Sequence, residues 1–206
     1  MAGIQRLVFA SANAGKAREI QALLGDDVEL LLQGELGIES IEETGTTFAE
    51  NALLKARHAA LASGLPALAD DSGLEVDFLG GAPGVHSARY AGDNAGDQAN
   101  LDKLLAELKG VPDAERGARF RCALAFVRHD DDEPVIVDAS WEGRIAQQPA
   151  GSGGFGYDPV FFDEASGCTS AQLQPFEKNA RSHRGKALQL LREELQRQGL
   201  LPAAAR

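Results

Sequence analysis

The chain has few long apolar runs and few cysteines. Near its N-terminus only residues 7–10 form an uninterrupted apolar run, which is too short for a signal peptide or a membrane span. Cys122 and Cys168 form no CxxC pair, so we interpret them as reduced thiols of a cytoplasmic protein. Neither has an obvious partner histidine and no GxSxG motif occurs, so covalent catalysis is not expected.

Basic residues are also fewer than acidic residues. The 20 Lys and Arg residues face 31 Asp and Glu residues, which gives a net charge of −11. Long-range repulsion therefore argues against a nucleic-acid polymer or an anionic membrane as partner. A small anionic ligand held by local cations and a metal remains compatible with this charge. The 206 residues suffice for one large domain, residues 1–206, built as two intimate lobes.

Apolar runs alternate with helical patterns, which predicts an α/β fold with a mixed sheet. A capping box, Thr47 to Glu50, starts a helix that runs to residue 63 and carries Asn51, Lys55 and His58 on one polar face. Further helices are expected over residues 14–24 and 97–109, a short one after Thr169, and a last one capped by Ser182. Strands are expected over residues 6–10, 28–32, 65–69, 74–79, 118–128 and 134–142, the last two forming a hairpin around an acidic turn, 130–133.

The run Leu68-Ala69-Asp70-Asp71-Ser72-Gly73 places two carboxylates at the end of an apolar strand. Burying unpaired carboxylates is costly, and paired ones suit a hard cation such as Mg²⁺. Asp, Ser and Gly also favour solvated turns. This stretch alone leaves the metal site and the turn equally open.

A strand-to-helix turn is expected at Ser11-Ala12-Asn13-Ala14-Gly15-Lys16. Free backbone N–H groups and the positive helix end favour phosphate there, and Lys16 adds a charge. The turn is not a Walker A loop, because Ala10 and Ala17 stand where that motif needs Gly and Ser or Thr. The alternative is a simple helix cap with a solvated lysine.

Three further segments can carry chemistry. In Glu42-Glu43-Thr44-Gly45 one glutamate can join Asp71 around a metal, although acidic residues also favour helix N-termini. Residues 151–158 form a glycine-rich loop in which Phe155 can stack on a planar ring, or simply anchor the loop in the core. Residues 177–186 gather four cations in an acidic protein, which indicates either an anionic or carbonyl partner or a solvated face.

Taken together, these motifs resemble one family, the inosine/xanthosine triphosphate pyrophosphatases. The resemblance spans nearly the whole chain in order, although Ala12 replaces a glycine that many members carry. The matching motifs are Ser11-x-Asn13-x-Gly15-Lys16, Glu42-Glu43-Thr44-Gly45, Phe48-x-Glu50-Asn51-Ala52, Ala69-Asp70-Asp71-Ser72-Gly73, Gly81-Ala82-Pro83-Gly84, Ser87-Ala88-Arg89-Tyr90, Gly153-Gly154-Phe155-Gly156-Tyr157-Asp158-Pro159 and Ser182-His183-Arg184-Gly185.

The resemblance implies hydrolysis of the α–β phosphoanhydride of ITP, dITP and XTP, with Mg²⁺ as the metal and Mn²⁺ as an alternative ion. It implies two lobes around a long central mixed sheet with flanking helices and an active-site cleft, and a homodimer. The family's metal ligands fall on Glu42 and Asp71, and Asp71 is also its proton acceptor. Its substrate-binding residues fall on Ser11, Ala12, Asn13, Ala14, Gly15, Lys16, Ser72, Phe155, Gly156, Tyr157, Asp158, Lys178, His183 and Arg184. Of these, the resemblance assigns recognition of the base to the residues from Phe155 onward.

Phosphoryl transfer needs charge neutralisation and an oriented water more than a protein nucleophile. We expect Lys16 and Lys55 to supply the neutralising charge and Asp70 to share the duties of Asp71. Donors from His183 or Arg184 suit the 6-carbonyl of hypoxanthine and xanthine, whereas adenine presents a donor there. A nucleotide-binding module without turnover is the alternative, but it would need no acidic pair. A phosphatase, or a pyrophosphatase of other nucleotides such as those with pyrimidine or modified bases, is a second alternative.

Overall fold

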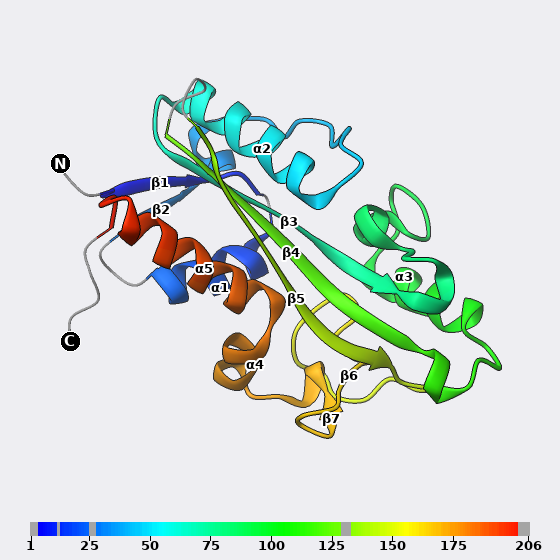
Figure 1. Cartoon of the computed structure of the whole chain (residues 1–206). Coiled ribbons are helices and arrows are strands. Elements are labelled where there is room, and N and C mark those ends of the chain that lie inside the picture. Colours follow the sequence, from blue (N-terminus) through cyan, green and yellow to red (C-terminus); the bar gives the residue numbers. More distant parts are fainter. Residues whose placement is uncertain (1–3, 12, 25–27, 129–132, 202–206) are drawn as a thin grey trace. The chain divides into compact units, whose positions relative to one another are not determined.

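The computed structural model describes residues 4–11, 13–24, 28–128 and 133–201 (Figure 1). Ala12 and most of the predicted acidic turn at 130–133 lie outside the described residues. The helices are α1 (Ala14–Leu24), α2 (Phe48–Ser63), α3 (Asp97–Glu107), α4 (Pro175–Arg181) and α5 (His183–Arg197). The strands are β1 (Arg6–Phe9), β2 (Glu29–Leu32), β3 (Ala67–Val76), β4 (Gly117–Val127), β5 (Val135–Ile145), β6 (Phe161–Asp163) and β7 (Cys168–Thr169).

The seven strands form one sheet in the order β2-β1-β3-β4-β5-β6-β7. β1 pairs in parallel with β2 and β3, whereas β6 pairs antiparallel with β5 and β7. The predicted α/β fold with a mixed sheet is therefore confirmed. No helix among the described residues is long and apolar enough to cross a membrane.

β3 differs from the prediction of two strands separated at the aspartates. It is one continuous strand of 10 residues, and the predicted second strand over 74–79 was wrong at its end, where Asp77–Leu79 form a 3-10 helix. The strand does not turn at Asp70 and Asp71 because both carboxylates have partners within the protein. The solvated-turn interpretation of this stretch is therefore excluded.

The chain forms two compact units, and β3, β4 and β5 each contribute residues to both. Unit 1 comprises Met1–Asp71, Cys122–Ala139 and Arg184–Arg206. Unit 2 comprises Ser72–Arg121 and Ser140–His183. Each unit has its own apolar core.

In unit 1, helices cover both faces of the sheet (Figure 1). Leu7 and Phe9 of β1 join a core cluster with residues of α1 and α5, including Ile20 and Leu191. The alternating residue Val8 is also fully buried and points to the other face, where α2 packs against β1. Successive residues of a strand in this unit therefore meet different helices.

In unit 2, the second core cluster joins α3 to the strands. It holds Leu101 and Leu104 of α3 together with Leu74, Trp141 and Phe161. The side chain of Phe120 extends this cluster, with its ring centroid 4.4 Å from that of Phe161. The core supports the loop of residues 151–158, because Tyr157 belongs to the same cluster.

α2 is capped at both ends. The Thr47 side chain accepts a hydrogen bond from the Glu50 N–H at 3.2 Å, and the Glu50 carboxylate accepts one from the Thr47 N–H at 3.2 Å. The helix ends at Gly64, whose φ of 67° is a left-handed conformation that glycine adopts without strain. The predicted capping box and helix are confirmed.

Replacing Thr47 with alanine removes the side-chain cap of α2. We expect Thr47→Ala to lower the free energy of unfolding by about 1 kcal/mol, as for other N-cap threonines. The measurement is the urea midpoint, with Thr44→Ala as control, because Thr44 is exposed and lies outside the helix. Equal midpoints for Thr47→Ala and Thr44→Ala would contradict the capping role.

Candidate functional site

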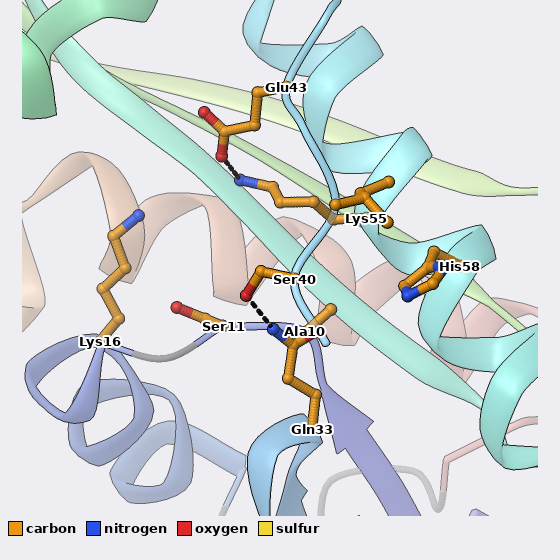
Figure 2. A pocket seen from close by; sticks show the side chains of 9 residues that line it. Ala10, Ser11, Lys16, Gln33, Ser40, Glu43, Lys55 and His58 are labelled. Carbon is orange, nitrogen blue, oxygen red and sulfur yellow. Dashed lines mark hydrogen bonds and ion pairs between the residues drawn. The ribbon is translucent and has the colours of Figure 1, made fainter. Parts of the chain in front are cut away.

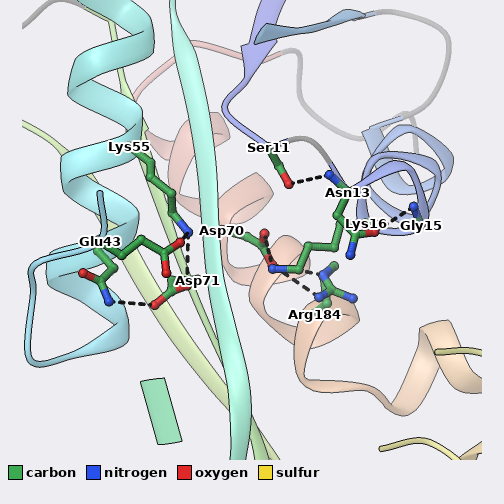
Figure 3. A network of polar contacts seen from close by, with 10 residues as sticks. Ser11, Asn13, Gly15, Lys16, Glu43, Lys55, Asp70, Asp71 and Arg184 are labelled. Carbon is green, nitrogen blue, oxygen red and sulfur yellow. Dashed lines mark hydrogen bonds and ion pairs between the residues drawn. The ribbon is translucent and has the colours of Figure 1, made fainter. Parts of the chain in front are cut away.

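The two adjacent aspartates of β3 lie on opposite faces of the sheet (Figure 3). Both are buried, with Asp70 1% and Asp71 6% exposed. Side chains of a strand alternate between faces, so Asp70 points toward α1 and α5 while Asp71 points toward α2. The pair is therefore two separate sites and not one double carboxylate.

Asp70 contacts two cations. Lys16 Nζ lies 2.9 Å from Asp70 Oδ1, and Arg184 donates to Asp70 Oδ2 from Nε and Nη2, each at 3.3 Å. Lys16 comes from the first turn of α1 and Arg184 from the first turn of α5. The Lys16 side chain is not a solvated lysine, since it is only 17% exposed.

Asp71 shares one cation with a second carboxylate. Lys55 Nζ lies 3.1 Å from Asp71 Oδ1 and 2.7 Å from Glu43 Oε1. Burial raises the pKa of Asp71, and the nearby Glu43 charge adds to this against the opposing effect of Lys55. Burial alone lowers the pKa of Lys55, but the charges of Asp71, Asp70 and Glu43 outweigh it and raise that pKa.

The two aspartates of β3 differ in the charges that contact them. Lys16 and Arg184 contact the carboxylate of Asp70, whereas the carboxylates of Glu43 and Asp71 both contact the ammonium of Lys55. The cations gathered at Asp70 suit an anion, and the carboxylates gathered at Asp71 suit a cation.

The predicted phosphate turn has a structured cap. Asn13 Oδ1 accepts from the N–H groups of Gly15 at 2.9 Å and Lys16 at 3.1 Å, and Ser11 Oγ accepts from the Asn13 N–H at 3.1 Å. Asn13 thus caps α1, in agreement with the alternative of a simple helix cap. That alternative also expected a solvated lysine, whereas Lys16 is ion-paired. Ala14 starts the helix, and Ala12 lies outside the described residues.

A pocket of about 140 Å³ opens beside this turn in unit 1 (Figure 2). Its lining includes Lys16, Lys55 and Ser11 together with residues that the sequence did not single out for binding. The whole lining is Ala10, Ser11, Lys16, Gln33, Ser40, Ile41, Glu43, Lys55 and His58. Cationic and hydrogen-bonding groups dominate it, which fits a small polar anion.

The donors on the Asp71 face fit Mg²⁺ with few protein ligands. Among the described residues, no group of three or more His, Cys, Asp or Glu side chains forms a metal-binding cluster. Mg²⁺ is commonly held by one or two carboxylates plus water and substrate phosphates, so Asp71 and one glutamate suffice. Glu42 is exposed, whereas Glu43 contacts Lys55 beside Asp71. Glu43 is a further candidate for the site, which the sequence could not distinguish from its neighbour.

The predicted base-reading residues, apart from Arg184, lie in unit 2, where Asp158 is the centre of a buried network. Lys178 Nζ lies 2.7 Å from Asp158 Oδ2, and Ser170 Oγ donates to Oδ1 at 2.7 Å. The Phe155 N–H donates to Oδ2 at 2.8 Å. A Cβ on Gly154 would stand 2.0 Å from the same oxygen, so only glycine fits there. Asp158 thus shapes the loop in addition to any contact with a base.

The remaining base-reading candidates are each held in place. Phe155 is half-buried, and Lys178 Nζ lies 5.1 Å from its ring centroid. The Gly156 N–H donates to Asp97 Oδ2 at 2.8 Å. The Tyr157 hydroxyl donates to the Ser87 carbonyl at 2.8 Å, and burial raises its pKa above the usual range.

His183 is the first residue of α5, and the half-buried Ser72 follows Asp71 in β3. The imidazole of His183 stacks on Phe120 with a centroid distance of 4.9 Å. The ring therefore has one face occupied by an aromatic side chain of its own unit.

Comparison with known proteins gives one family. The model of the Ham1 family matches residues 7–194. A protein of Escherichia coli named dITP/XTP pyrophosphatase is 57% identical over 194 residues, which cover 93% of this chain and 98% of that protein.

Two solved structures are also similar to this chain. A HAM1 protein from Coxiella burnetii has a TM-score of 0.87 at 48% identity, and the Ham1 protein of Staphylococcus aureus has 0.84 at 39%. Each match covers 94% of this chain and 100% of the other.

The buried pair of Lys178 and Asp158 predicts a strong dependence of stability on both partners. Lys178→Met leaves the Asp158 charge buried without its cation, and we expect a loss of about 3 kcal/mol in the free energy of unfolding. In the double variant Lys178→Met with Asp158→Asn, the loss should be smaller than the sum of the two single losses. Chemical denaturation of all four proteins measures this coupling, and strict additivity would contradict it.

Proposed function

Because this chain belongs to the Ham1 family, we propose that it hydrolyses deaminated purine nucleoside triphosphates such as ITP, dITP and XTP to the monophosphate and pyrophosphate. The observation that carries the proposal is that two cations meet Asp70 on one face of β3, while two carboxylates meet Lys55 on the other. One face suits phosphate groups and the other suits a cation that accompanies them. The similarity to a dITP/XTP pyrophosphatase supplies the nucleotide class.

The turn of residues 11–16 and Lys55 are proposed to hold the triphosphate. Lys16 already contacts Asp70, so a bound phosphate would share an ammonium whose position is set before binding. Lys55 would balance charge from its place between Glu43 and Asp71. Fixed cations of this kind stabilise the charge that develops on the leaving pyrophosphate without rearranging during the reaction.

The proposed metal is Mg²⁺, with Mn²⁺ as an alternative ion, held by Asp71 and Glu42 as the family resemblance implies. Glu43 supports the same site through Lys55. When bound, the ion neutralises phosphate charge and lowers the pKa of nearby water. Asp71 would accept the proton of the attacking water, as the family resemblance implies.

We propose for Asp70 a role other than the sharing of duties expected from the sequence. Its carboxylate lies on the opposite face from Asp71 and holds Lys16 and Arg184. We assign it the orientation of these two cations, one for phosphate and one for the base. This division follows from the alternation of β3.

Base selection is assigned to Phe155, Gly156, Tyr157, Asp158, Lys178, His183 and Arg184. Donors among them suit the 6-carbonyl of hypoxanthine and xanthine and leave unpaired groups against adenine, at ~1–3 kcal/mol each. The close packing of the loop around Asp158 supports a rigid recognition surface. Ser72 is assigned to the substrate site as well.

We further propose a homodimer in the cytoplasm, with neither a nucleic-acid polymer nor a membrane as partner.

A pyrophosphate-release assay across ITP, dITP, XTP, GTP and ATP with Mg²⁺ tests the function. We expect release of pyrophosphate from the first three at rates at least about 100-fold above ATP, since polar pairing discriminates strongly. The matched control is the same assay in excess EDTA, where the rate should fall to background. Orthophosphate as the first product, or equal rates on ITP and ATP, would reject the proposal.

Asparagine substitutions separate the roles of the two aspartates. For Asp71→Asn we expect kcat to fall by roughly 100-fold or more, because the proton acceptor is lost. For Asp70→Asn we expect mainly a higher KM for nucleotide, roughly fivefold or more, because Lys16 and Arg184 lose their anchor. Steady-state kinetics on ITP measure both, and circular dichroism checks the folds. The same kcat and KM pattern in both variants would contradict the division.

A further inference from the structure

A buried amide connects Asp71 to the acidic segment of residues 42–45. Asn51 lies on α2 and is 1% exposed. Its Nδ2 donates to Asp71 Oδ2 at 3.2 Å, and its Oδ1 accepts from the Gly45 N–H at 2.8 Å. Both ends of the amide are therefore used, one on β3 and one on the segment that carries the two glutamates.

The backbone at Gly45 lies so close to α2 that no room remains for a side chain. A Cβ at position 45 would stand 2.6 Å from Asn51 Oδ1 and 2.8 Å from the Cβ of Glu50. Only glycine allows the backbone to approach α2 this closely. The Asn51 amide and Gly45 thus help to set the distance between the glutamates and Asp71.

The polar face of α2 also holds the chain of residues 39–43 at two points. His58 Nε2 lies 3.0 Å from the Glu39 carbonyl, and Lys55 Nζ lies 2.7 Å from Glu43 Oε1. Lys55 is a cation and partly cancels the charge of the carboxylates that it holds. Asn51 is neutral, so it orients Asp71 and leaves the negative charge available to a divalent cation.

We propose that Asn51 is a positioning residue that holds Asp71 and the segment of residues 42–45 at the spacing required for divalent-cation binding. This inference rests on the proposed function for the identity of the ion, and its geometry stands on the contacts above. Asn51 acts through Asp71 and Gly45 and is not itself assigned a contact with substrate.

The test measures Mg²⁺ binding by calorimetry without nucleotide. Asn51→Leu keeps the side-chain volume but removes both hydrogen bonds, and Gly45→Ala keeps Asn51 but displaces the segment. We expect the Kd for Mg²⁺ to rise at least about tenfold in each variant, the range found for groups that orient metal ligands. Hydrogen exchange of the Gly45 amide should also accelerate in Asn51→Leu.

Asn100→Leu is the matched control in unit 2. Asn100 is 3% exposed and likewise makes two hydrogen bonds, from the Ala91 N–H at 2.7 Å and to the Ala88 carbonyl at 3.1 Å. Neither partner is an ionisable side chain. Asn100→Leu should lower the thermal midpoint by an amount similar to that of Asn51→Leu, with a Kd for Mg²⁺ within about twofold of the wild type.

The outcomes separate this inference from the proposed function. Mg²⁺ affinity within about twofold of the wild type in Asn51→Leu or Gly45→Ala overturns the inference, whatever the thermal midpoint. A wild-type chain that binds no Mg²⁺ overturns it as well. A wild-type chain that binds Mg²⁺ but does not hydrolyse ITP, dITP or XTP rejects the proposed function, while a weakened affinity in the two variants still supports the role of Asn51.

Discussion

The site depends on the placement of two adjacent carboxylates in the middle of a buried strand. Because β3 stays extended through Asp70 and Asp71, their side chains point to opposite faces of the sheet. Each charge then needs its own compensation, since a buried unpaired carboxylate is unfavourable. Lys16 and Arg184 provide it on one face, and Lys55 provides it on the other. The groups proposed to bind phosphate and the cation thereby start from opposite faces of one strand, although Lys16 and Lys55 both line the pocket of unit 1.

α2 carries the residues that contact Asp71 on its face of the sheet. Its apolar side packs on the sheet, and its opposite polar residues hold the preceding segment and Asp71 at once. The capping box at Thr47 and Glu50 fixes where the helix begins, so the polar residues follow at defined distances from the acidic segment. One short stretch of sequence therefore links the start of α2, the path of the preceding segment and the position of the Asp71 carboxylate.

Local patterns predicted α1, α2, α3, α5 and the mixed sheet, because caps and apolar periodicity act over a few residues, but they did not predict the short helix α4. The predicted break between residues 69 and 74 does not occur, since Asp, Ser and Gly favour turns when nothing pairs them, whereas Asp70 and Asp71 are ion-paired. β6 and β7 were not predicted, because strands of three and two residues carry almost no periodicity. Glu42 and Glu43 could not be told apart, because adjacent residues differ only in the direction their side chains take.

The sequence by itself determined the types of residue available for chemistry and their order: a capped turn with Lys16, an acidic pair before α2, paired aspartates and a glycine-rich loop. Those features are local, and the motif resemblance that they carry agrees with the Ham1 family match. Only the tertiary structure decided which side chains meet. Asp70 lies against Arg184, 114 residues away in the chain, and Asp71 lies against Asn51, 20 residues away. Such contacts follow from strand alternation and helix packing, which no short stretch of sequence encodes alone.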